Sequence, residues 1–490
     1  MKMRTVFVLR EVASSPMKSM KCLSDTSAST YRSWLVLRQK LKALLLTMDD
    51  GAQAVAKVPN PNAGRPHFTT ASEVATMEFV RETLGTPVPK VHAWSSRAQE
   101  NAVGVEYIIM EKVPGVQLDF VWAGMGIEDR LTIAKAIARY QKTWTSFSFK
   151  KFGSLYYAKD LDGHNQSPLY TDCHGVTITN PRFAVGPSTG RDFSDDGRLA
   201  VEFDRGPWNN LEAYQSAIGH REIACVRSLP RLPKSPVTLC CPGIYRPTRE
   251  KKLRAIQCYL TMIKYLLPTD QSIQSSCLWH SDLHVENIFV NPKDPTEIVG
   301  IIDWQSTELA PLFYHARQPY FLDYDGPPTL GLERPRLPEN LAQLDPAAQR
   351  QAKALYLNRS LSALYKTLLH RQNPPLYRAL AFRETSSFDL LLLARNLLVD
   401  GEATYLAQVV ELEKIAEIHA DVSGALRSIE AMREVQETLG ELFPERGIVR
   451  EEQYEEARDA LRQIKEQVLE TFARDESDRG IWREVWPFDD

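Results

Sequence analysis

The sequence contains no glycine before Gly51, and its first 42 residues contain almost no acidic side chains. Residues 1–42 carry nine lysines or arginines, many serines and threonines, and only Glu11 and Asp25 as acids. An Arg-rich, Ser-rich and acid-poor composition is typical of a mitochondrial transit peptide; a disordered basic tail or a mispredicted first exon would share it. We therefore expect residues 1–42 to be a segment apart, and a mitochondrial location is favoured over a cytoplasmic one.

Cysteine is also scarce, with seven in 490 residues, odd in number and irregularly spaced. No two of them have the spacing of zinc ligands, and the adjacent Cys240 and Cys241 are a poor basis for a disulfide framework. The pattern favours reduced thiols in an intracellular compartment.

Long apolar runs are missing as well. A membrane-spanning helix needs about 18 or more consecutive apolar residues, and the run DLLLLARNLLVD at 389–400 is broken by Arg395 and Asn396. The formal net charge of −3 offers no sign of the basic surface that nucleic acid requires. We expect neither a transmembrane segment nor a nucleic-acid partner.

What is present begins with a small α+β unit at residues 43–113. The stretch KALLLTMDDGAQAVAKVPNP predicts two strands joined by a tight turn at Asp50 and Gly51. TTASEVATMEFVRETLG then predicts a helix, capped by Thr69, Thr70 or Ser72 and stopped by Gly85. VEYIIMEKVPG predicts a further strand, so the order is strand, strand, helix, strand.

The remaining chain, residues 114–475, is expected to be larger and mostly helical. Helical patterns cover 128–148, the stretch REKKLRAIQCYLTMIKYLLP and most of the chain after Pro328, whereas 150–250 reads as irregular. The charged helices at the end form an extension, and 476–490 a tail.

One segment, LWHSDLHVENIFVNPKDPTEIVGIIDWQS at 278–306, gathers the polar residues of a site. Its pattern His-x-Asp-x4-Asn places His280, Asp282 and Asn287 on one loop. Transfer of a phosphoryl group from ATP to a hydroxyl needs a carboxylate that accepts the proton, and oxygen ligands for Mg²⁺. Asp282 is the candidate base, and His280 is expected to support the loop.

The residues after Asn287 fit a β-hairpin that ends on Asp303. IFV forms the outgoing strand, NPKDP the turn and EIVGII the returning strand, which brings Asp303 back beside Asn287. The sequence therefore predicts that Asn287 and Asp303 bind Mg²⁺. Taken singly, each of these residues has an ordinary explanation as a cap, a turn residue or a strand end.

Such chemistry also requires a strand lysine that holds the ATP phosphates and a helix glutamate that orients it. Lys57 ends the second strand of the first hairpin, and Glu73 lies in the helix that follows. The backbone from Glu111 to Val113, after the third strand, is expected to face the adenine.

Several motifs together resemble the aminoglycoside phosphotransferase (APH) family, a kinase-like group that phosphorylates small molecules. The likeness is closer to its fungal branch that includes the altered-inheritance-of-mitochondria proteins, and it rests on VAKVPNP, TTASEVATMEFV, YIIMEKVPG, RFAVGPSTGRDF, EFDRGPW, AIGHREIACVRSLPRLPKSP, LWHSDLHVENIFVNP and IVGIIDWQSTELAPLFYHARQP. It spans about residues 44–472. The resemblance implies a bilobal kinase-like fold, ATP and Mg²⁺ as cofactors, and a mitochondrial location. It also implies that Asp282 is the catalytic base, that Asn287 and Asp303 are magnesium ligands, and that Lys57 and Glu73 lie at the nucleotide.

The sequence departs from that family at its N-terminus. Such enzymes have a further strand and a phosphate-covering loop before the hairpin, whereas LRQKLKALLLT runs directly into it here. We therefore expect a truncated N-terminal lobe. Two functions stay open: an ATP- and Mg-dependent phosphotransferase acting on a hydroxyl of an unidentified small molecule, or a catalytically weak kinase-like scaffold protein in mitochondria.

Overall fold

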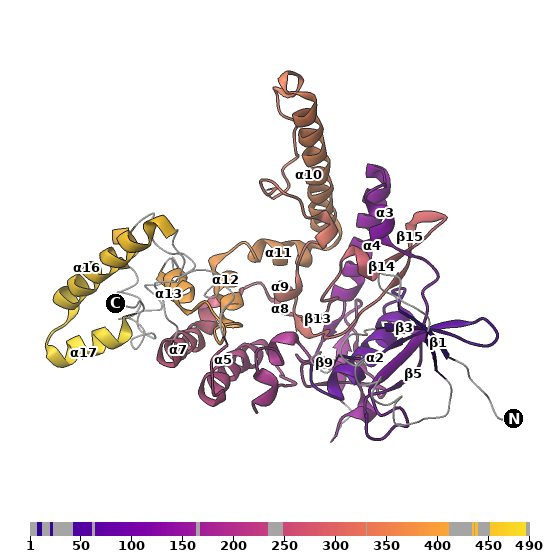
Figure 1. The fold of residues 1–490 in the computed structure, drawn as a ribbon, viewed down its shortest axis with the longest axis horizontal. Coiled ribbons are helices and arrows are strands. Elements are labelled where there is room, and N and C mark those ends of the chain that lie inside the picture. The colour runs from indigo at the N-terminus through magenta and orange to yellow at the C-terminus, as the bar shows by residue number, and fades with distance from the viewer. Residues whose placement is uncertain are drawn as a thin grey trace. The chain divides into compact units, whose positions relative to one another are not determined.

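The structure is a computed structural model that describes residues 7–11, 20–22, 43–60, 64–162, 167–233, 248–329, 331–410, 434–435, 437–439 and 451–486. The chain divides into two compact units, each built from two separate stretches. Unit 1 comprises residues 1–191 and 272–381, and unit 2 comprises residues 192–271 and 382–490. Figure 1 shows the elements of both in chain order by colour.

An antiparallel sheet of six strands opens unit 1, in the order β2-β1-β3-β4-β6-β5. Its strands are β1 (Phe7–Glu11), β2 (Met20–Cys22), β3 (Ala43–Thr47), β4 (Gln53–Lys57), β5 (Val91–Ser95) and β6 (Tyr107–Glu111). β3 and β4 pair in register from Ala43↔Lys57 to Thr47↔Gln53. Gly51 has a φ of 84° at the turn, and the Asp50 carboxylate accepts a hydrogen bond from the Ala52 backbone N–H. The predicted hairpin is confirmed.

Helix α2 (Phe68–Glu82) follows the hairpin and buries most of one face, including Val74, Met77 and Phe79. The predicted cap is wrong: the N-cap residue is His67, no side chain caps the helix, and Thr69, Thr70 and Ser72 lie inside it, buried. Gly85, with a φ of 64°, follows the end of the helix as expected.

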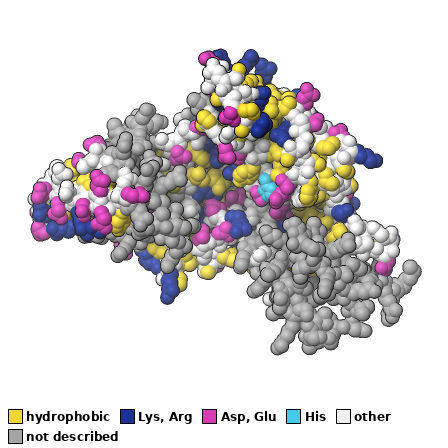
Figure 2. All heavy atoms as spheres, turned by 45° about the horizontal axis from the view of Figure 1, so that its top comes forward, with side chains coloured by type: hydrophobic (Ala, Val, Ile, Leu, Met, Phe, Trp, Pro, Cys, Tyr) yellow, Lys and Arg dark blue, Asp and Glu magenta, His cyan; other side chains and the backbone are white. Residues whose placement is uncertain are grey.

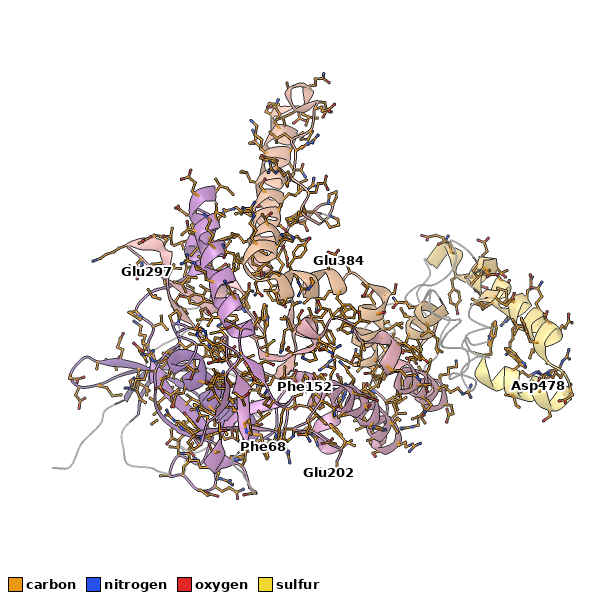
Figure 3. All side chains as sticks on the ribbon, turned by 180° about the vertical axis from the view of Figure 1, so that it is seen from behind. Phe68, Phe152, Glu202, Glu297, Glu384 and Asp478 are labelled. Carbon is orange, nitrogen blue, oxygen red and sulfur yellow. The ribbon has the colours of Figure 1, made fainter. Side chains whose placement is uncertain are left out.

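Unit 1 then builds three small antiparallel sheets, in the orders β15-β14-β7, β11-β10-β8-β13-β16 and β12-β9. Their strands are β7 (Val116–Gln117), β8 (Ser148–Phe149), β9 (Ser154–Tyr157), β10 (Pro168–Thr171), β11 (Thr177–Thr179), β12 (Phe183–Gly186), β13 (Ser276–Leu278), β14 (Ile288–Asn291), β15 (Asp294–Ile301) and β16 (Leu309–Pro311). Figure 3 shows Phe152 among densely packed side chains and Glu297 at the edge, on the β14–β15 hairpin.

The helices of unit 1 are α3 (Leu118–Trp122), α4 (Ile127–Thr145), α8 (Gln271–Gln274), α9 (Leu312–His315), α10 (Pro346–Gln372) and α11 (Pro374–Phe382), with short 3-10 turns η1 (Ala158–Asp160), η4 (Val285–Asn287), η5 (Tyr320–Leu322) and η6 (Leu341–Gln343). α4 buries Ile133, Ile137, Gln141 and Trp144 along one face at helical spacing. α10 packs beside α4, where the Tyr365 hydroxyl donates to the Gln141 side chain over 2.5 Å.

Unit 2 is helical in its described part. It contains α5 (Leu211–Ser228), α7 (Arg249–Leu266), α12 (Ser386–Ala394), α13 (Glu402–Val410), α16 (Tyr454–Phe472) and α17 (Glu476–Val485), and the 3-10 turns η2 (Arg191–Phe193), which begins at the boundary, η3 (Arg198–Ala200) and η8 (Glu451–Gln453). The side chains of Asn210 and Thr248 cap α5 and α7. α5 packs against α7, and α7 against α12 and α13.

Four expectations from sequence need correction or completion. The chain does not run into the first hairpin without a preceding strand, because β1 pairs with β3 at Arg10↔Leu45 and Glu11↔Leu44. β5, which pairs with β6, was missed. The region 150–250 is not wholly irregular, since its described part holds α5 and four short strands, β9 to β12. Residues 476–485, assigned to a tail, form α17.

Other expectations are confirmed: the helices at 128–148 and in REKKLRAIQCYLTMIKYLL appear as α4 and α7, and the hairpin after Asn287 appears as β14 and β15. Among the described residues, no helix is long and apolar enough to cross a membrane. Cys173, Cys225, Cys258 and Cys277 are free thiols in the part of the chain that is described. Cys240 and Cys241 lie outside the described residues.

Candidate active site

Lys57, Glu73 and Asp303 meet in one ionic triad within unit 1. The Lys57 ammonium lies 2.7 Å from the Glu73 carboxylate and 2.8 Å from the Asp303 carboxylate. Lys57 arrives on β4, Glu73 on the second turn of α2, and Asp303 just after β15. The triad therefore joins three elements that the sequence analysis had proposed to cooperate, across a separation of 246 residues between Lys57 and Asp303.

The charges of the triad shift one another's pKa values. Burial alone lowers the pKa of the Lys57 ammonium, but the carboxylates of Glu73 and Asp303 outweigh it and raise the pKa above its ordinary value. Burial raises the pKa of Glu73, whose side chain is only 2% exposed, and the Lys57 ammonium opposes that rise. Lys57 is therefore held as a cation, with Glu73 on its buried side and the 44% exposed Asp303 on its open side.

The loop that carries Asp282 is built on a buried histidine. The His280 Nε2 donates to the Ile302 carbonyl over 2.8 Å, and its Nδ1 accepts from the Asp282 backbone N–H. Burial lowers the pKa of His280, so the neutral ring is favoured. Its ring lies edge to face on Trp304, with centroids 4.6 Å apart. His280 thus links the two ends of the segment and supports the loop, as the sequence suggested.

Asp282 itself is open to solvent, with 54% of its side chain exposed. Its neighbour His284, which was not predicted from the sequence, has its Nε2 3.3 Å from the Asp282 carboxylate. The Nδ1 of His284 accepts from the Glu286 backbone N–H over 3.3 Å, and its Nε2 also lies 3.2 Å from the Asn287 Nδ2, so the ring stands between Asp282 and Asn287. Its position two residues after Asp282, inside the motif itself, was the one signal available in the sequence.

The Asn287 side chain is held by the loop that carries Asp282. Its Nδ2 donates to the Asp282 carbonyl over 2.9 Å, while no described residue donates to its Oδ1. Its backbone carbonyl accepts from the Ile302 N–H over 3.0 Å, so Asn287 and the residue before Asp303 are bonded directly. The amide oxygen of Asn287 and the carboxylate of Asp303 form the hard-oxygen donor set that suits Mg²⁺. Their residue types fit Mg²⁺, and their role as its ligands stays a prediction.

The backbone after β15 turns sharply so that Asp303 faces Lys57. Asp303 and Ser306 have φ values of 63° and 57°, in the left-handed region that few residues other than glycine adopt. Buried contacts hold this turn: the Trp304 indole donates to the Ile301 carbonyl over 3.1 Å, and the Thr307 hydroxyl to the Trp304 carbonyl over 2.8 Å. Trp304 packs edge to face on Trp144 of α4.

A second loop, Gly186–Gly190 of the GPSTG motif, clamps the same turn from the other side. The Ser188 hydroxyl donates to the Glu308 carboxylate over 2.5 Å and accepts from the Gly190 N–H. The Ser154 hydroxyl donates to the Thr307 carbonyl over 2.9 Å. A Cβ at Gly190 would lie 2.3 Å from the Glu308 carboxyl carbon, so only glycine fits there without movement. This clamp was not foreseen from the sequence.

The residues expected at the adenine lie at the end of β6. The Glu111 backbone N–H donates to the Lys90 carbonyl over 2.8 Å, and its carboxylate accepts from the Lys90 N–H. Val113 is buried against Gly300 of β15, where a Cβ would come within 2.6 Å of the valine side chain. Glu111 is thus the last residue of β6, and Val113 packs against the hairpin that leads to Asp303. Their role at a nucleotide stays a prediction.

Figure 2 shows acidic side chains gathered around a histidine on one face of the molecule. Among the described residues, no cluster of three or more His, Cys, Asp or Glu side chains has the arrangement of a metal site. A site built from Asn287 and Asp303 alone would leave coordination positions for substrate phosphates and water, which is how Mg²⁺ is commonly held.

A strand lysine paired with a helix glutamate, beside an exposed aspartate loop, is the arrangement found in kinase-like phosphotransferases. The family model "Phosphotransferase enzyme family" (APH) matches residues 42–315, and the chain belongs to that family.

Among its relatives is a subtelomeric hrmA-associated cluster protein of Aspergillus fumigatus, 32% identical over 64% of this chain and 65% of that protein. Altered inheritance of mitochondria protein 9, mitochondrial, of Komagataella phaffii is 26% identical over 63% of this chain and 51% of that protein. The chain thus spans between half and two thirds of the length of these curated relatives. A crystal structure of a thermostable mutant of aminoglycoside phosphotransferase APH(4)-Ia has 13% identity and a TM-score of 0.33, covering 79% of this chain and 91% of that one.

Proposed function

We propose that this protein is an ATP- and Mg-dependent phosphotransferase that transfers the γ-phosphate to a hydroxyl of a small molecule. The observation that carries the proposal is the Lys57 ammonium held between Glu73 and Asp303, at 2.7 and 2.8 Å. A cation fixed beside a carboxylate with oxygen-ligand character is the arrangement that nucleotide phosphates with a metal require.

Each residue has a role in this proposal. Lys57 binds the phosphates, and Glu73 orients Lys57 from the buried side. Asp282 accepts the proton of the acceptor hydroxyl, and its exposure leaves room for that substrate. Asn287 and Asp303 hold Mg²⁺, which when bound supplies charge neutralisation at the phosphates. The backbone from Glu111 to Val113 lies along the adenine.

The first test is Mg-ATP binding by calorimetry, for the intact chain and for Asp303→Asn. We expect binding that requires magnesium and that weakens at least about tenfold in the variant, a loss of about 1.4 kcal/mol. Glu297→Gln, at an exposed position within β15, is the control and should bind like the intact chain. Absence of binding by the intact chain would contradict the proposal and favour a non-catalytic scaffold.

The second test separates catalysis from binding. Labelled γ-phosphate is offered with pools of hydroxyl-bearing metabolites, and Asp282→Asn is compared with the intact chain. Loss of a general base should lower the transfer rate by about 10²-fold or more while Mg-ATP affinity stays within about twofold. Glu286→Gln, in the same loop and exposed, should transfer normally. A variant Asp282→Asn as fast as the intact chain would remove Asp282 from the role of base.

We also propose a mitochondrial location, supported by the basic, acid-poor residues 1–42 and by the mitochondrial names of several relatives. A transit peptide cleaved near residue 42 would remove β1 and β2 from the sheet. Cell fractionation with N-terminal sequencing of the mature chain tests both points. An intact N-terminus in the cytosolic fraction would contradict the location.

A further inference from the structure

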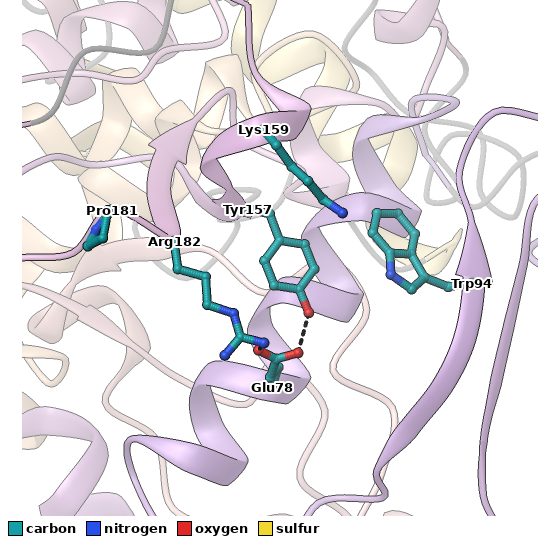
Figure 4. Close-up of a pocket in the computed structure, with 6 residues that line it drawn as sticks. All are labelled: Glu78, Trp94, Tyr157, Lys159, Pro181 and Arg182. Carbon is teal, nitrogen blue, oxygen red and sulfur yellow. Dashed lines mark hydrogen bonds and ion pairs between the residues drawn. The ribbon is translucent and has the colours of Figure 1, made fainter.

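Unit 1 contains a pocket whose lining includes none of the residues of the candidate active site. It has a volume of about 410 Å³ and is lined by Glu78, Trp94, Tyr157, Lys159, Pro181 and Arg182. These residues come from α2, β5, β9, η1 and the turn before β12, and none of them belongs to the phosphotransferase residues described above (Figure 4). The volume lies within the range of small-molecule sites, about 300–1,000 Å³.

One wall of the pocket is a row of aromatic rings. Tyr157 is stacked between Trp94 and Phe183, with ring centroids 5.9 and 5.5 Å away and interplanar angles of 29° and 23°. Tyr157 is buried, whereas Trp94 at the outer end of the row is only half-buried. A flat apolar surface of this kind favours a planar ligand, which buries a large area on it at small cost in conformational entropy.

The charges at the pocket are not balanced. The Arg182 guanidinium is paired with the Glu78 carboxylate and, at 3.1 Å, with the Glu82 carboxylate. The Tyr157 hydroxyl donates to the other oxygen of Glu78 over 2.6 Å, and burial raises the pKa of this phenol, which keeps it a donor. Glu78 is thus fully engaged by protein groups, so it offers little to a cationic ligand.

Lys159 is the other cation that lines the pocket. Its ammonium lies 5.7 Å from the centroid of the Trp94 ring and 5.5 Å from that of Tyr157. Among the described residues, no carboxylate lies within ion-pair distance of it, and the adjacent Asp160 acts on it only at longer range. In Figure 4 the lysine side chain extends toward the space between the two rings. An anionic group placed there would gain an ion pair without displacing an existing one.

We propose that this pocket is a binding site for a small planar aromatic anion, its ring on Trp94 and its carboxylate or phosphate on Lys159. The site is independent of the proposed phosphotransfer chemistry. A ligand here would touch α2, the helix that also carries Glu73, so it would join that helix to β5 and β9.

The test uses 2-naphthoate as the probe, titrated into the full chain in a calorimeter. Saturable binding of one probe per chain is expected, and the neutral 2-naphthalenemethanol should bind at least tenfold more weakly. Lys159→Met should weaken 2-naphthoate at least tenfold, and Trp94→Leu should do the same. Lys150→Met, an exposed lysine outside the pocket, is the matched control and should leave the affinity unchanged. Unfolding temperatures of the variants show that each one folds.

Three outcomes would overturn the proposal. The first is no saturable binding of the probe at millimolar concentration. The second is an affinity that survives Lys159→Met, or equals that of the neutral analogue, because either shows that the ammonium is not used. The third is stoichiometric displacement of the probe by Mg-ATP, which would place it in the nucleotide site. Because the readout is probe binding, failure here leaves the ATP-binding test of the proposed function unaffected.

Discussion

Glu73 shows how a single buried carboxylate can set the position of a lysine ammonium. Its side chain is buried in α2 and forms a 2.7 Å ion pair with the Lys57 ammonium. Burying a carboxylate is costly unless it is paired. The pair is stable because the positive charge of the Lys57 ammonium lies beside the buried carboxylate, and because Lys57 also forms an ion pair with Asp303.

Replacing Glu73 by Gln keeps the shape and removes the charge. We expect the free energy of unfolding to fall by about 1–3 kcal/mol, because the Lys57 ammonium loses its buried partner. Lys57 would then depend on Asp303 alone, so Mg-ATP affinity should fall about tenfold if Lys57 binds the phosphates. Urea unfolding and calorimetry measure the two effects.

The control for this change is Glu82→Gln, on the same helix and exposed, where the surface pair with Arg182 contributes little. Unchanged stability and unchanged nucleotide affinity in Glu73→Gln would contradict the role of Glu73.

At the scale of single residues, the sequence indicated which residues belong to the candidate site, but not which side chains contact one another. Lys57, Glu73 and Asp303 could be chosen from the chemistry that phosphoryl transfer needs, and the structure brings them together. His284 could not be chosen in that way, because a histidine in a loop has many roles. Its place beside Asp282 depends on the tight turn in which the His284 N–H donates to the Asp282 carbonyl over 3.1 Å.

At the scale of elements, the loop Gly186–Gly190 acts as a clamp on the turn that follows Asp303. Gly190 lies against Glu308 so closely that the position has no room for a side chain. The Ser188 hydroxyl satisfies the buried Glu308 carboxylate from the same loop. Displacement of this loop would release Glu308, and with it the turn that aims Asp303.

Gly190→Ala should therefore destabilise the protein by about 1–3 kcal/mol, the usual cost of overpacking a close contact. If Asp303 holds Mg²⁺, the magnesium concentration needed for half-maximal ATP binding should also rise. Differential scanning fluorimetry and a magnesium titration of ATP binding measure these effects.

Gly124→Ala is the matched control, because its nearest contact would be an ordinary 3.7 Å to the Val121 carbonyl. A variant Gly190→Ala that is as stable as Gly124→Ala would show that the loop moves freely away from Glu308.

The elements that the sequence predicted are those with local signals. The Asp50–Gly51 turn indicated β3 and β4, and the apolar periodicity indicated α4 and α7. Helix α5 was missed because its buried face includes Gln215, Gly219, Arg221 and Glu222, which look like a solvent-exposed face. These polar residues are buried because distant residues neutralise them, and that pairing leaves no periodic signal in the sequence.

At the scale of the whole molecule, each compact unit is assembled from two separate stretches. The units are therefore not consecutive segments of the chain. The chain leaves unit 1 after Arg191, returns to it at Ser272 and leaves it again after Ala381. In unit 2 the two stretches are joined by buried polar contacts. The Lys252 ammonium lies 2.9 Å from the Glu402 carboxylate, and the Arg221 guanidinium donates to the Arg395 carbonyl over 2.6 Å.

Asp192 belongs to the same buried network of unit 2. Its carboxylate lies 2.8 Å from the Arg221 guanidinium and 2.6 Å from that of Arg395. Burial alone would raise the pKa of Asp192, but the charges of Arg395 and Arg221 outweigh it and lower the pKa from 3.8 to about 2. The native state therefore binds this proton less readily than the unfolded chain does. The stabilisation is complete well above pH 3.8 and is lost as the pH falls from there through about 2.

The change Asp192→Asn removes this carboxylate and its titration. At about pH 6 the variant should be less stable than the intact chain by about 2–3 kcal/mol, the free energy that corresponds to the pKa shift. The difference should shrink by about half at about pH 3, because the intact chain then loses the same interaction by protonation. Urea unfolding followed by circular dichroism at several pH values measures this difference in stability.

The control is Asp459→Asn, at an exposed position of α16, which should lower the free energy of unfolding by at most about 0.5 kcal/mol at every pH. A deficit in Asp192→Asn that stays constant from about pH 6 to about pH 3 would show that Asp192 is not the acid-sensitive tie between the two stretches of unit 2.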